Sequence, residues 1–308
     1  MITQHLGDLD YPHLGADRGQ LLDGQVQVKV VGKPGLPFQV VSALTGTVFG
    51  SGQIGANGST MANVNPLSMG DIYGVKSMDD GIVHDPFLTP VKVWSTPDTL
   101  SSGFQIQPLA PTRGLVAEIG GSTDMAPSLS MARPATPPTS NQQWQAWLLV
   151  GTEQDVQPAG GGKYVLVSNL SIPGTVYWKT EWQHAVGNIP TETPTDPNLA
   201  GTVICYQWMI QEGSNLYFSD ILGVMLRGSI WDPSQANQSQ ASGGGSSAQK
   251  SSGSTKASGK KLKKTPKPQT RRKMDPTVQA SLGKWLIMKN AKPLPAKMWT
   301  KLKALARK

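Results

Sequence analysis

QVQVKVV at residues 25–31 alternates polar and apolar side chains along its length. Val26, Val28 and Val30 therefore project from one face of an extended chain, and the polar side chains between them project from the other. Valine is also favoured in strands, because its branched side chain packs well on a pleated surface. The stretch predicts a β-strand with one buried face and one face in solvent.

Similar runs recur through the first 233 residues, separated by turn segments such as GKPG (32–35), GANGST (55–60) and PTETPTDPN (190–198). Further strands are predicted at residues 38–44, 47–49, 71–75, 91–94, 104–109, 115–119, 144–150, 163–167, 176–182, 203–209, 215–218 and 224–231. Many short strands with Pro- and Gly-rich loops predict an all-β fold, a sandwich or barrel. Residues 1–233 are long enough for one large β domain or two small ones.

Charge divides the chain after residue 233. Residues 234–308 hold 18 Lys and Arg and one acidic residue, a net charge of +17. Residues 1–233 hold 10 basic and 19 acidic residues, a net charge of −9, so the total of +8 hides the asymmetry. A strongly basic segment beside a mildly acidic one points to a nucleic-acid or anionic-membrane partner for the basic segment.

The basic part begins with a Ser/Gly-rich stretch, residues 234–259, which cannot bury enough apolar surface to order itself, so we predict a flexible linker. The polybasic run KKLKKTPKPQTRRK (260–273) completes a tail over residues 234–273. It suits a polyphosphate, with affinity that depends on salt and not on base sequence. A solubilising or localisation signal is the alternative. The residues assigned to nucleic-acid binding are Lys250, Lys256, Lys260, Lys261, Lys263, Lys264, Lys267, Arg271, Arg272 and Lys273.

Residues 274–308 read as a basic amphipathic helical segment. Asp275 and Pro276 suit an N-cap and a first helical position, and the apolar residues Val278, Leu282, Trp285 and Leu286 then share one face. A second helix is predicted at about residues 296–306, with Met298, Trp299, Leu302 and Leu305 on one side. Such helices can lie on a membrane, bind RNA through their charged side, or dock their apolar faces on the body of the same or another subunit.

Signals for catalysis, targeting or membrane spanning are missing from the sequence. No HExxH, paired CxxC, GxSxG or nucleotide fingerprint occurs, so we expect no enzyme, and we expect no cofactor or metal ion. The first 24 residues lack the pattern of a secretory signal, and no run of 18 apolar residues predicts a spanning helix. The single cysteine, Cys205, excludes an intramolecular disulfide and fits the core of a strand.

Two acidic clusters offer oxygen atoms of the kind that bind Ca²⁺, although neither has the spacing of a known loop, and solvated loop acids are the simpler interpretation. They comprise Asp8, Asp10, His13 and Asp17 near the start, and Asp79, Asp80, His84 and Asp85 further on.

The strand series from residue 25 to 231, followed by the basic run at 260–273, resembles in layout the coat (capsid) protein of a small non-enveloped icosahedral RNA virus. VYWKTEW (176–182) is similar in texture to a late strand of that family's sandwich. The resemblance implies an antiparallel jelly-roll-like β-sandwich and a homo-oligomeric shell in the virion, assembled in the host cytoplasm. It also implies RNA bound by the basic tail, and leaves open a membrane contact through residues 276–308 and contacts with other capsid proteins.

The sequence departs from this family in one respect, and one further family property can be carried over to it. Most such coats carry the basic arm at the N-terminus, whereas here it is C-terminal, which puts the usual strand topology in doubt. Some of these families release a C-terminal amphipathic peptide by self-cleavage after an asparagine, and Asn290–Ala291 is the matching bond in this sequence. We further expect a body lacking residues 234–308 to fold but to bind no RNA.

Other function classes remain open on the residues alone. A carbohydrate- or ligand-binding β-sandwich with a basic anchoring tail would use exposed tryptophans. Trp144 and Trp147 fall on opposite faces of one predicted strand, which favours exposure of one of them. A hydrolase on an all-β scaffold, or a cellular nucleic-acid-binding protein with a basic tail, would also fit the layout.

Overall fold

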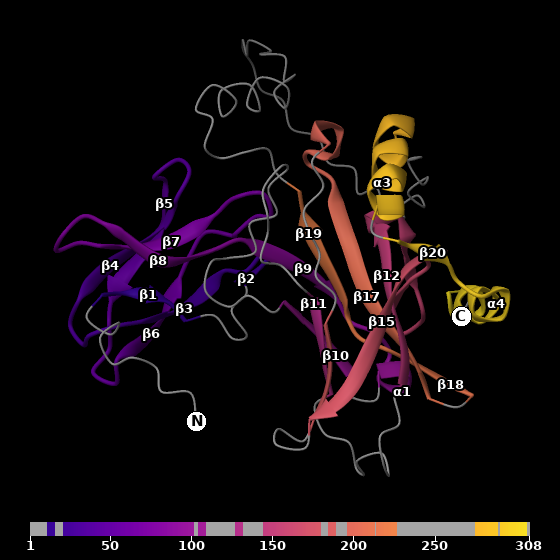
Figure 1. The fold of residues 1–308 in the computed structure, drawn as a ribbon. Coiled ribbons are helices and arrows are strands. Elements are labelled where there is room, and N and C mark those ends of the chain that lie inside the picture. Colours follow the sequence, from indigo (N-terminus) through magenta and orange to yellow (C-terminus); the bar gives the residue numbers. More distant parts are fainter. Residues whose placement is uncertain are drawn as a thin grey trace, which may run out of the picture.

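The computed structural model describes residues 11–15, 21–101, 104–108, 127–131, 144–179, 184–188, 196–212, 214–226, 275–288 and 290–306. The chain consists mostly of β-strands in several largely antiparallel sheets with few helices, which confirms the all-β class. It forms two regions that lie side by side (Figure 1). The first region holds residues 11–88, and the second holds the described residues of 90–226 together with residues 275–306.

The first region is a sandwich of two sheets. One sheet has the order β1–β3–β6, and the other has the order β5–β4–β7–β8. The strands are β1 (His13–Leu14), β3 (Gln27–Val31), β4 (Pro37–Ser42), β5 (Val48–Gln53), β6 (Ser59–Asn63), β7 (Tyr73–Ser77) and β8 (Val83–Leu88). At the sheet edges β5 contacts β6 and β1 contacts β8. The two sheets therefore enclose one core between them.

Alternation in β3 places its side chains as the sequence predicts, with one exception. Val28 and Val30 are fully buried between the sheets, beside Phe38 and Val75 from the opposite sheet. Val26, by contrast, is 52% exposed, because the strand begins one residue later, at Gln27. The predicted inward face of this strand thus holds two valines and not three.

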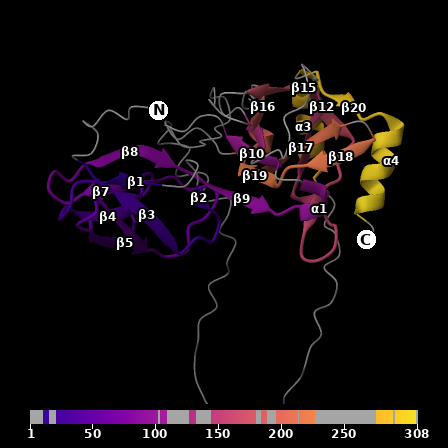
Figure 2. The ribbon, with the colours of Figure 1, turned by 90° about the horizontal axis from the view of Figure 1, so that it is seen from below.

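The two regions join without a linker. β8 passes into β9 (Pro90–Trp94) through Thr89, which is buried and donates its hydroxyl hydrogen to the Asp71 carbonyl at 2.9 Å. β2 (Leu21–Leu22), from the first part of the chain, pairs in parallel with β9 of the second region. Gly70 has φ +90°, and a Cβ there would lie 2.8 Å from the Met225 sulfur. Seen from below, β9 lies between the two regions (Figure 2).

The second region is built on one large sheet with the order β10–β11–β16–β15–β12–β17–β19–β9–β2. Its further strands are β10 (Phe104–Pro108), β11 (Pro127–Met131), β12 (Trp144–Thr152), β15 (Leu170–Lys179), β16 (His184–Asn188), β17 (Val203–Glu212) and β19 (Ile221–Met225). β18 (Asn215–Phe218) pairs with β17, and β13 (Val156–Pro158) and β14 (Tyr164–Leu166) form a separate hairpin. Short helices connect them: α1 (Asp98–Ser101), η3 (Glu153–Asp155) and η5 (Pro197–Leu199).

The central strands of this sheet are buried on both faces. In β17, Tyr206 and Trp208 point to one face, which we call the Tyr206 face, and Cys205 and Met209 point to the other, the Cys205 face. All four side chains are at most 3% exposed. A sheet that is apolar on both sides needs a covering layer on each.

A buried polar cluster fixes the hairpin β13–β14 on the Cys205 face. The Gln207 side chain accepts a hydrogen bond from the Leu166 amide at 2.8 Å and donates to the Thr96 hydroxyl at 2.9 Å and to the Ser219 carbonyl at 2.8 Å. Gln207 is fully buried, so these bonds replace all contact of its side chain with water. Val165 and Leu166 of the hairpin then pack on the sheet.

The remaining elements come from the end of the chain: α3 (Pro276–Met288), β20 (Lys292–Pro293) and α4 (Ala296–Leu305). They match the two predicted C-terminal helices closely in position. None of the helices that the structure describes is long and apolar enough to cross a membrane.

Candidate nucleic-acid interface

The ten basic residues that the sequence assigns to nucleic-acid binding lie outside the described residues: Lys250, Lys256, Lys260, Lys261, Lys263, Lys264, Lys267, Arg271, Arg272 and Lys273. Both ends of the segment that carries them are described. Leu226 is buried in the core of the Tyr206 face, and its amide donates to the Thr202 carbonyl at 2.8 Å. Asp275 starts α3, which packs on the same core. Residues 227–274 therefore connect two described parts of the second region, and we call this connecting segment the basic loop.

α3 begins as its sequence predicts. The Asp275 carboxylate accepts a hydrogen bond from the Thr277 amide at 2.7 Å, and this bond holds the pKa of Asp275 below its ordinary value. Pro276 occupies the first helical position, where its missing N–H has no intrahelical partner to lose. The basic loop thus ends at a capped helix.

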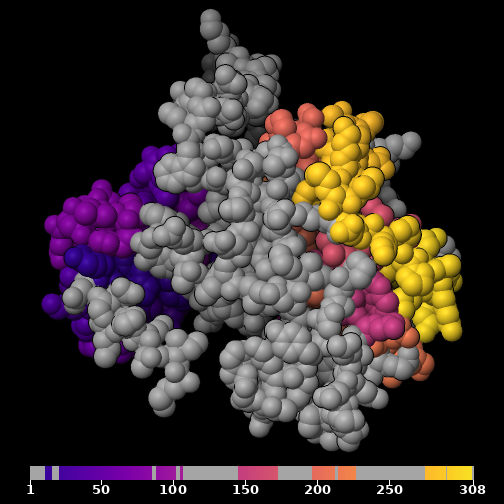
Figure 3. All heavy atoms as spheres, in the orientation of Figure 1, coloured from indigo at the N-terminus to yellow at the C-terminus, as the bar shows by residue number. Residues whose placement is uncertain are grey.

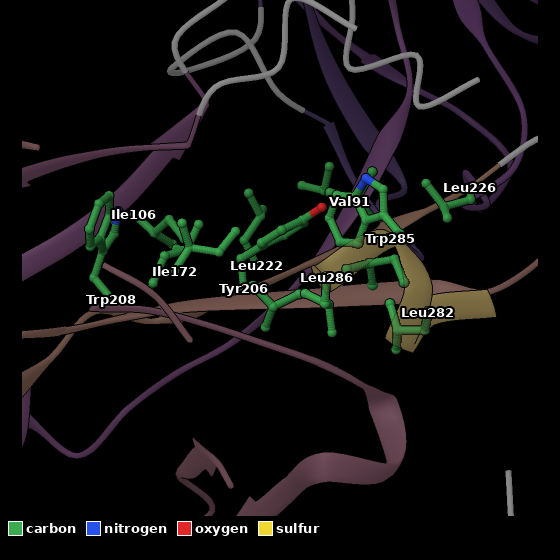
Figure 4. Close-up of a cluster of buried hydrophobic side chains, with 14 of the residues drawn as sticks. Val91, Ile106, Ile172, Tyr206, Trp208, Leu222, Leu226, Leu282, Trp285 and Leu286 are labelled. Carbon is green, nitrogen blue, oxygen red and sulfur yellow. The ribbon is translucent and has the colours of Figure 1, made fainter. Parts of the chain in front are cut away.

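The apolar side of α3 packs on the Tyr206 face. Leu282, Trp285 and Leu286 are at most 7% exposed and lie in one cluster with Tyr206 and Leu222 of the sheet (Figure 4). Of the three roles that the sequence left open for this side of the helix, the structure shows docking on the same chain.

A polar contact adds to this docking at Asp196, the N-cap residue of η5. The Ser281 hydroxyl hydrogen-bonds the Asp196 carboxylate, and this bond is the main reason that the pKa of Asp196 lies below its ordinary value. The Asn198 amide donates to the same carboxylate at 3.0 Å, and the charge of Lys284 lowers the pKa further. Asp196 therefore links η5 to the helix.

Asn290, which follows the end of α3 at Met288 by two residues, has a left-handed conformation with φ 54°. The Ala291 amide donates to the Leu286 carbonyl at 3.0 Å, and the Asn290 amide donates to the Ile287 carbonyl at 3.0 Å. Asparagine tolerates this conformation better than most residues, so it suits a helix C-terminus. The Asn290–Ala291 bond thus lies in a helix cap, and cleavage there stays a prediction.

β20 carries the chain past the edge of β15 to the opposite face. It pairs antiparallel with β15, Pro293 opposite Leu170 and Lys292 opposite Ser171, and the Leu294 amide donates to the Asn169 carbonyl at 3.0 Å. α4 then packs on the Cys205 face through Leu302, which is fully buried. We call residues 275–306 the strap, because α3 covers one face of the sheet and α4 covers the other.

The strap also carries an excess of positively charged side chains on its surface. Its one acidic residue is Asp275, and its five described lysines are exposed: Lys284, Lys292, Lys297, Lys301 and Lys303. We call these five the lysine band. Figure 3 shows the strap as a band of yellow atoms along one side of the molecule. The two ion pairs between described residues, His84–Asp80 and Lys92–Glu153, involve none of them.

Two members of the lysine band have neutral partners. The Lys301 ammonium donates to the Ser214 carbonyl at 3.2 Å, beside a shallow groove that is lined by Leu100, Leu216 and Leu305. The Lys303 ammonium lies 4.7 Å from the centre of the Trp299 ring. Both contacts orient the lysine ammonium group, and neither partner carries a negative charge that would neutralise it.

The acidic clusters do not form a metal site in the part of the chain that is described. His84 pairs with Asp80 at 2.9 Å and stacks on Tyr11 with ring centres 4.2 Å apart. No group of three or more His, Cys, Asp or Glu in the described ranges could hold an ion. Asp8, Asp10 and Asp17 lie outside those ranges, and so does the side chain of Asp85.

Tryptophans within the described ranges form no exposed platform. Trp208 and Trp285 are buried, and Trp94, Trp147 and Trp299 are half-buried. The side chains of Trp144, Trp178, Trp182 and Trp231 lie outside the description. Cys205 is fully buried, which raises the pKa of its thiol and agrees with the core position that the sequence predicts.

No family model matches the chain, and no curated protein matches it. A solved structure of a biofilm-associated protein, its BSP domain, matches with 13% sequence identity and a TM-score of 0.20. The match covers 70% of this chain, and the chain spans 29% of the length of that structure. A likeness of this size carries no argument about fold or function.

Proposed function

We propose that the chain is a capsid-type structural protein that self-assembles through its β regions and binds packaged RNA through its basic C-terminal part. The observation that carries the proposal is the separation of charge, +17 over residues 234–308 against −9 over residues 1–233. Phosphate neutralisation by Lys and Arg supplies affinity without reading bases, as packaging of a long RNA requires. We expect no catalytic activity.

The strap supports this proposal in a way that the sequence did not suggest. Because residues 227–274 are anchored at Leu226 and Asp275, the basic loop stays with the folded body. Its midpoint, 24 residues from either anchor, can reach at most about 80 Å. RNA held by many such loops would be kept close to the protein layer.

The jelly-roll-like sandwich over residues 1–233 also belongs to the proposal. Antiparallel pairs between strands far apart in sequence, β17 with β12 and β19 with β9, are of the kind that Greek-key connections produce and support it. Other shell proteins as partners, and residence in the virion, come with the same proposal. The carbohydrate-binding alternative draws no support from the described tryptophans.

Size and absorbance of the purified full-length protein test the proposal. We expect closed particles with a high ratio of nucleic-acid to protein absorbance, by size exclusion and negative-stain microscopy at low salt. The same sample in about 1 M salt, where the Debye length falls to ~3 Å, should release the nucleic acid.

A variant with the eight basic residues of 260–273 changed to Gln provides the control, and it should lose RNA while keeping the ability to assemble. A wild-type protein that stays a monomer free of nucleic acid, with and without added RNA, would overturn the proposal.

A further inference from the structure

We infer that the lysine band of the strap is a second RNA-contacting surface, preformed on the folded body and separate from the basic loop. The inference rests on the proposed function and adds to it a place where RNA lies against the protein. It concerns Lys284, Lys292, Lys297, Lys301 and Lys303, all of which are described and exposed.

Docking of the strap fixes the side on which these charges stand. Leu282, Trp285, Leu286 and Leu302 are at most 7% exposed and hold α3 and α4 on the two faces of the sheet. The lysines on the same elements are therefore held outward and are not free to turn into the body. A surface ordered before it binds loses less conformational entropy on binding than a disordered tail does.

The same docking distinguishes RNA from a bilayer as the partner. An amphipathic helix binds a membrane by inserting its apolar face among the acyl chains. In α3 and α4 the side chains that would insert, Trp285 and Leu302 above all, are already buried in the protein core. Besides its lysines, the docked strap exposes Ile287 and Met288 at the end of α3, and two such side chains do not form an apolar helix face. Exposed lysines without such a face suit a soluble polyanion.

Four of the five band lysines have no nearby acid among the interactions of the described residues, and the fifth, Lys284, acts on Asp196, whose pKa it lowers. Asp275, the strap's one acid, accepts a hydrogen bond from its own helix, and neither described ion pair includes a band lysine. In the first region, by contrast, Lys29, Lys33 and Lys76 share the surface with several acids, among them Asp23, Asp71, Asp79 and Asp80. A net positive surface concentrates phosphate, and a mixed one does not.

The band is joined directly to the basic loop, since only Met274 separates Lys273 from the strap. Once the loop has captured an RNA strand, the band meets that strand at a high effective concentration. The loop then collects RNA, and the band sets where the strand lies against the body.

A three-lysine variant of the full-length protein tests the inference. We would change Lys292, Lys297 and Lys303 to Gln, because Lys301 and Lys284 also make contacts that hold the strap. The matched control changes Lys29, Lys33 and Lys76, which removes the same charge from the first region. Both variants would be titrated with a fluorescein-labelled 20-nucleotide oligouridine at several salt concentrations.

The slope of log affinity against log salt should fall by about 2 in the band variant, since each phosphate contact to a single strand contributes ~0.7. The control should keep the wild-type slope. Equal slopes in band and control variants would overturn the inference, provided that both melt as the wild type does. So would a band variant that binds RNA normally and loses binding only to phosphatidylserine vesicles.

Different results of the same titrations would overturn the proposed function. If the wild-type protein does not bind the oligouridine, or if the loop variant with eight Gln binds it as strongly as the wild type, RNA binding by the basic loop is wrong. A loop variant with weak binding that weakens further on adding the band substitutions would support both claims.

Discussion

The first region closes its core with strands that lie within residues 13–88, whereas the second region recruits α3 and α4 from beyond the basic loop. In the first region Val28 and Val30 meet partners such as Phe38 and Val75, which lie within the same continuous stretch of chain. In the second, Tyr206 and Trp208 of β17 share a core with Leu282 and Trp285, more than 70 residues further along the chain. The boundary of the second region therefore does not coincide with the change in composition after residue 233.

The difference changes how the basic segment is understood. A change in composition after residue 233 suggests a body with a removable tail, yet the strap, residues 275–306, belongs to the body again. A cut after residue 233 also removes α3 and α4, which pack on the two faces of the second region's sheet. We therefore expect the second region to need residues 275–306 in order to fold, and the prediction that a protein lacking residues 234–308 still folds stays to be tested. The basic loop is an insertion into the fold.

Removal of the strap should have the largest effect. Ending the chain at residue 274 deletes Leu282, Trp285, Leu286 and Leu302, each of which contributes about 2–5 kcal/mol when buried. Their sum approaches the whole stability of a typical domain, 5–15 kcal/mol. We expect the second region to unfold while the first stays folded.

The reactivity of Cys205 measures whether the second region is folded, because Cys205 is the single cysteine and is fully buried in that region. Its thiol should react rapidly with a disulfide reagent in the truncated protein and not in the full chain. Equal protection in both would show that the strap is dispensable.

Within the strap, Trp285→Ala should destabilise the second region by about 3–5 kcal/mol, because it leaves a cavity against Tyr206. Trp285→Phe should cost less, since the indole N–H finds no acceptor among the described residues and its removal loses no hydrogen bond. Ile287→Ala on the same helix is the control, and at 75% exposure it should change the free energy of unfolding by less than about 0.5 kcal/mol. Chemical denaturation followed by tryptophan fluorescence measures all three, and similar losses for Ala at 285 and 287 would contradict the docking of α3.

The polar cluster of the Cys205 face should matter less than the strap. Gln207→Leu keeps the size of the side chain and leaves the Leu166 amide without its partner, whereas the Ser219 carbonyl still accepts a hydrogen bond from the Thr96 hydroxyl at 2.8 Å. Each buried group left unpaired costs about 1–3 kcal/mol. Gln53→Leu in the first region removes one exposed hydrogen bond, to the Gly35 carbonyl, and should be nearly neutral. Equal thermal shifts in the two variants would show that the cluster is not a stabilising contact.

The smallest effect on stability is expected when one of two aspartates, one in each region, is replaced by Asn. Hydrogen bonds lower the pKa of Asp196 and of Asp80 below the ordinary value of 3.8. A lowered pKa adds stability above the unfolded value and loses it as pH falls through the folded value. Asp196→Asn should therefore lower the melting temperature of the second region by less than about 2 °C at pH 7, and the difference from the wild type should be lost as pH falls through the lowered pKa of Asp196.

Asp80→Asn is the matched change in the first region, where Ile82 and His84 make the hydrogen bonds. It should affect only the transition of that region. A melting curve in which either variant shifts both transitions equally would show that the two regions unfold as one unit.

Local features of the strap were predictable from sequence. Asp275, Pro276 and the apolar spacing gave the start and the buried face of α3, and the predicted range 296–306 matches α4 almost to the residue. Both signals act within one or two helical turns. Which surface receives the apolar faces depends on contacts with β17, which no local pattern encodes, and docking was only one of three roles that the sequence allowed.

Besides the two-residue β1, the first-region strands β6 and β8 escaped prediction, for different reasons. β6 reads STMAN and looks like part of a turn, and its buried Ala62 is explained only by pairing with Val28 of β3. β8 contains Pro86, which cannot donate to a ladder and argues against a strand. The strand forms because it lies at the edge of its sheet, where a missing donor is tolerated.

For the candidate site, the amino-acid sequence predicts the excess of positive charge but not the arrangement of the lysines on the surface. The excess of Lys over acid in residues 275–306 is plain from composition. That five of these lysines are held outward by a core formed on both faces of a sheet follows from tertiary packing alone.

Native-state hydrogen exchange of the full-length protein tests the central claim most directly. Isolated helices of 13 and 10 residues are marginal in water, so amides of α3 and α4 can be protected only by docking. We predict that they exchange as slowly as those of β12 and β17, as members of one cooperative unit. Exchange of α3 and α4 at the rate of an unstructured tail, with β12 and β17 still protected, would contradict the account.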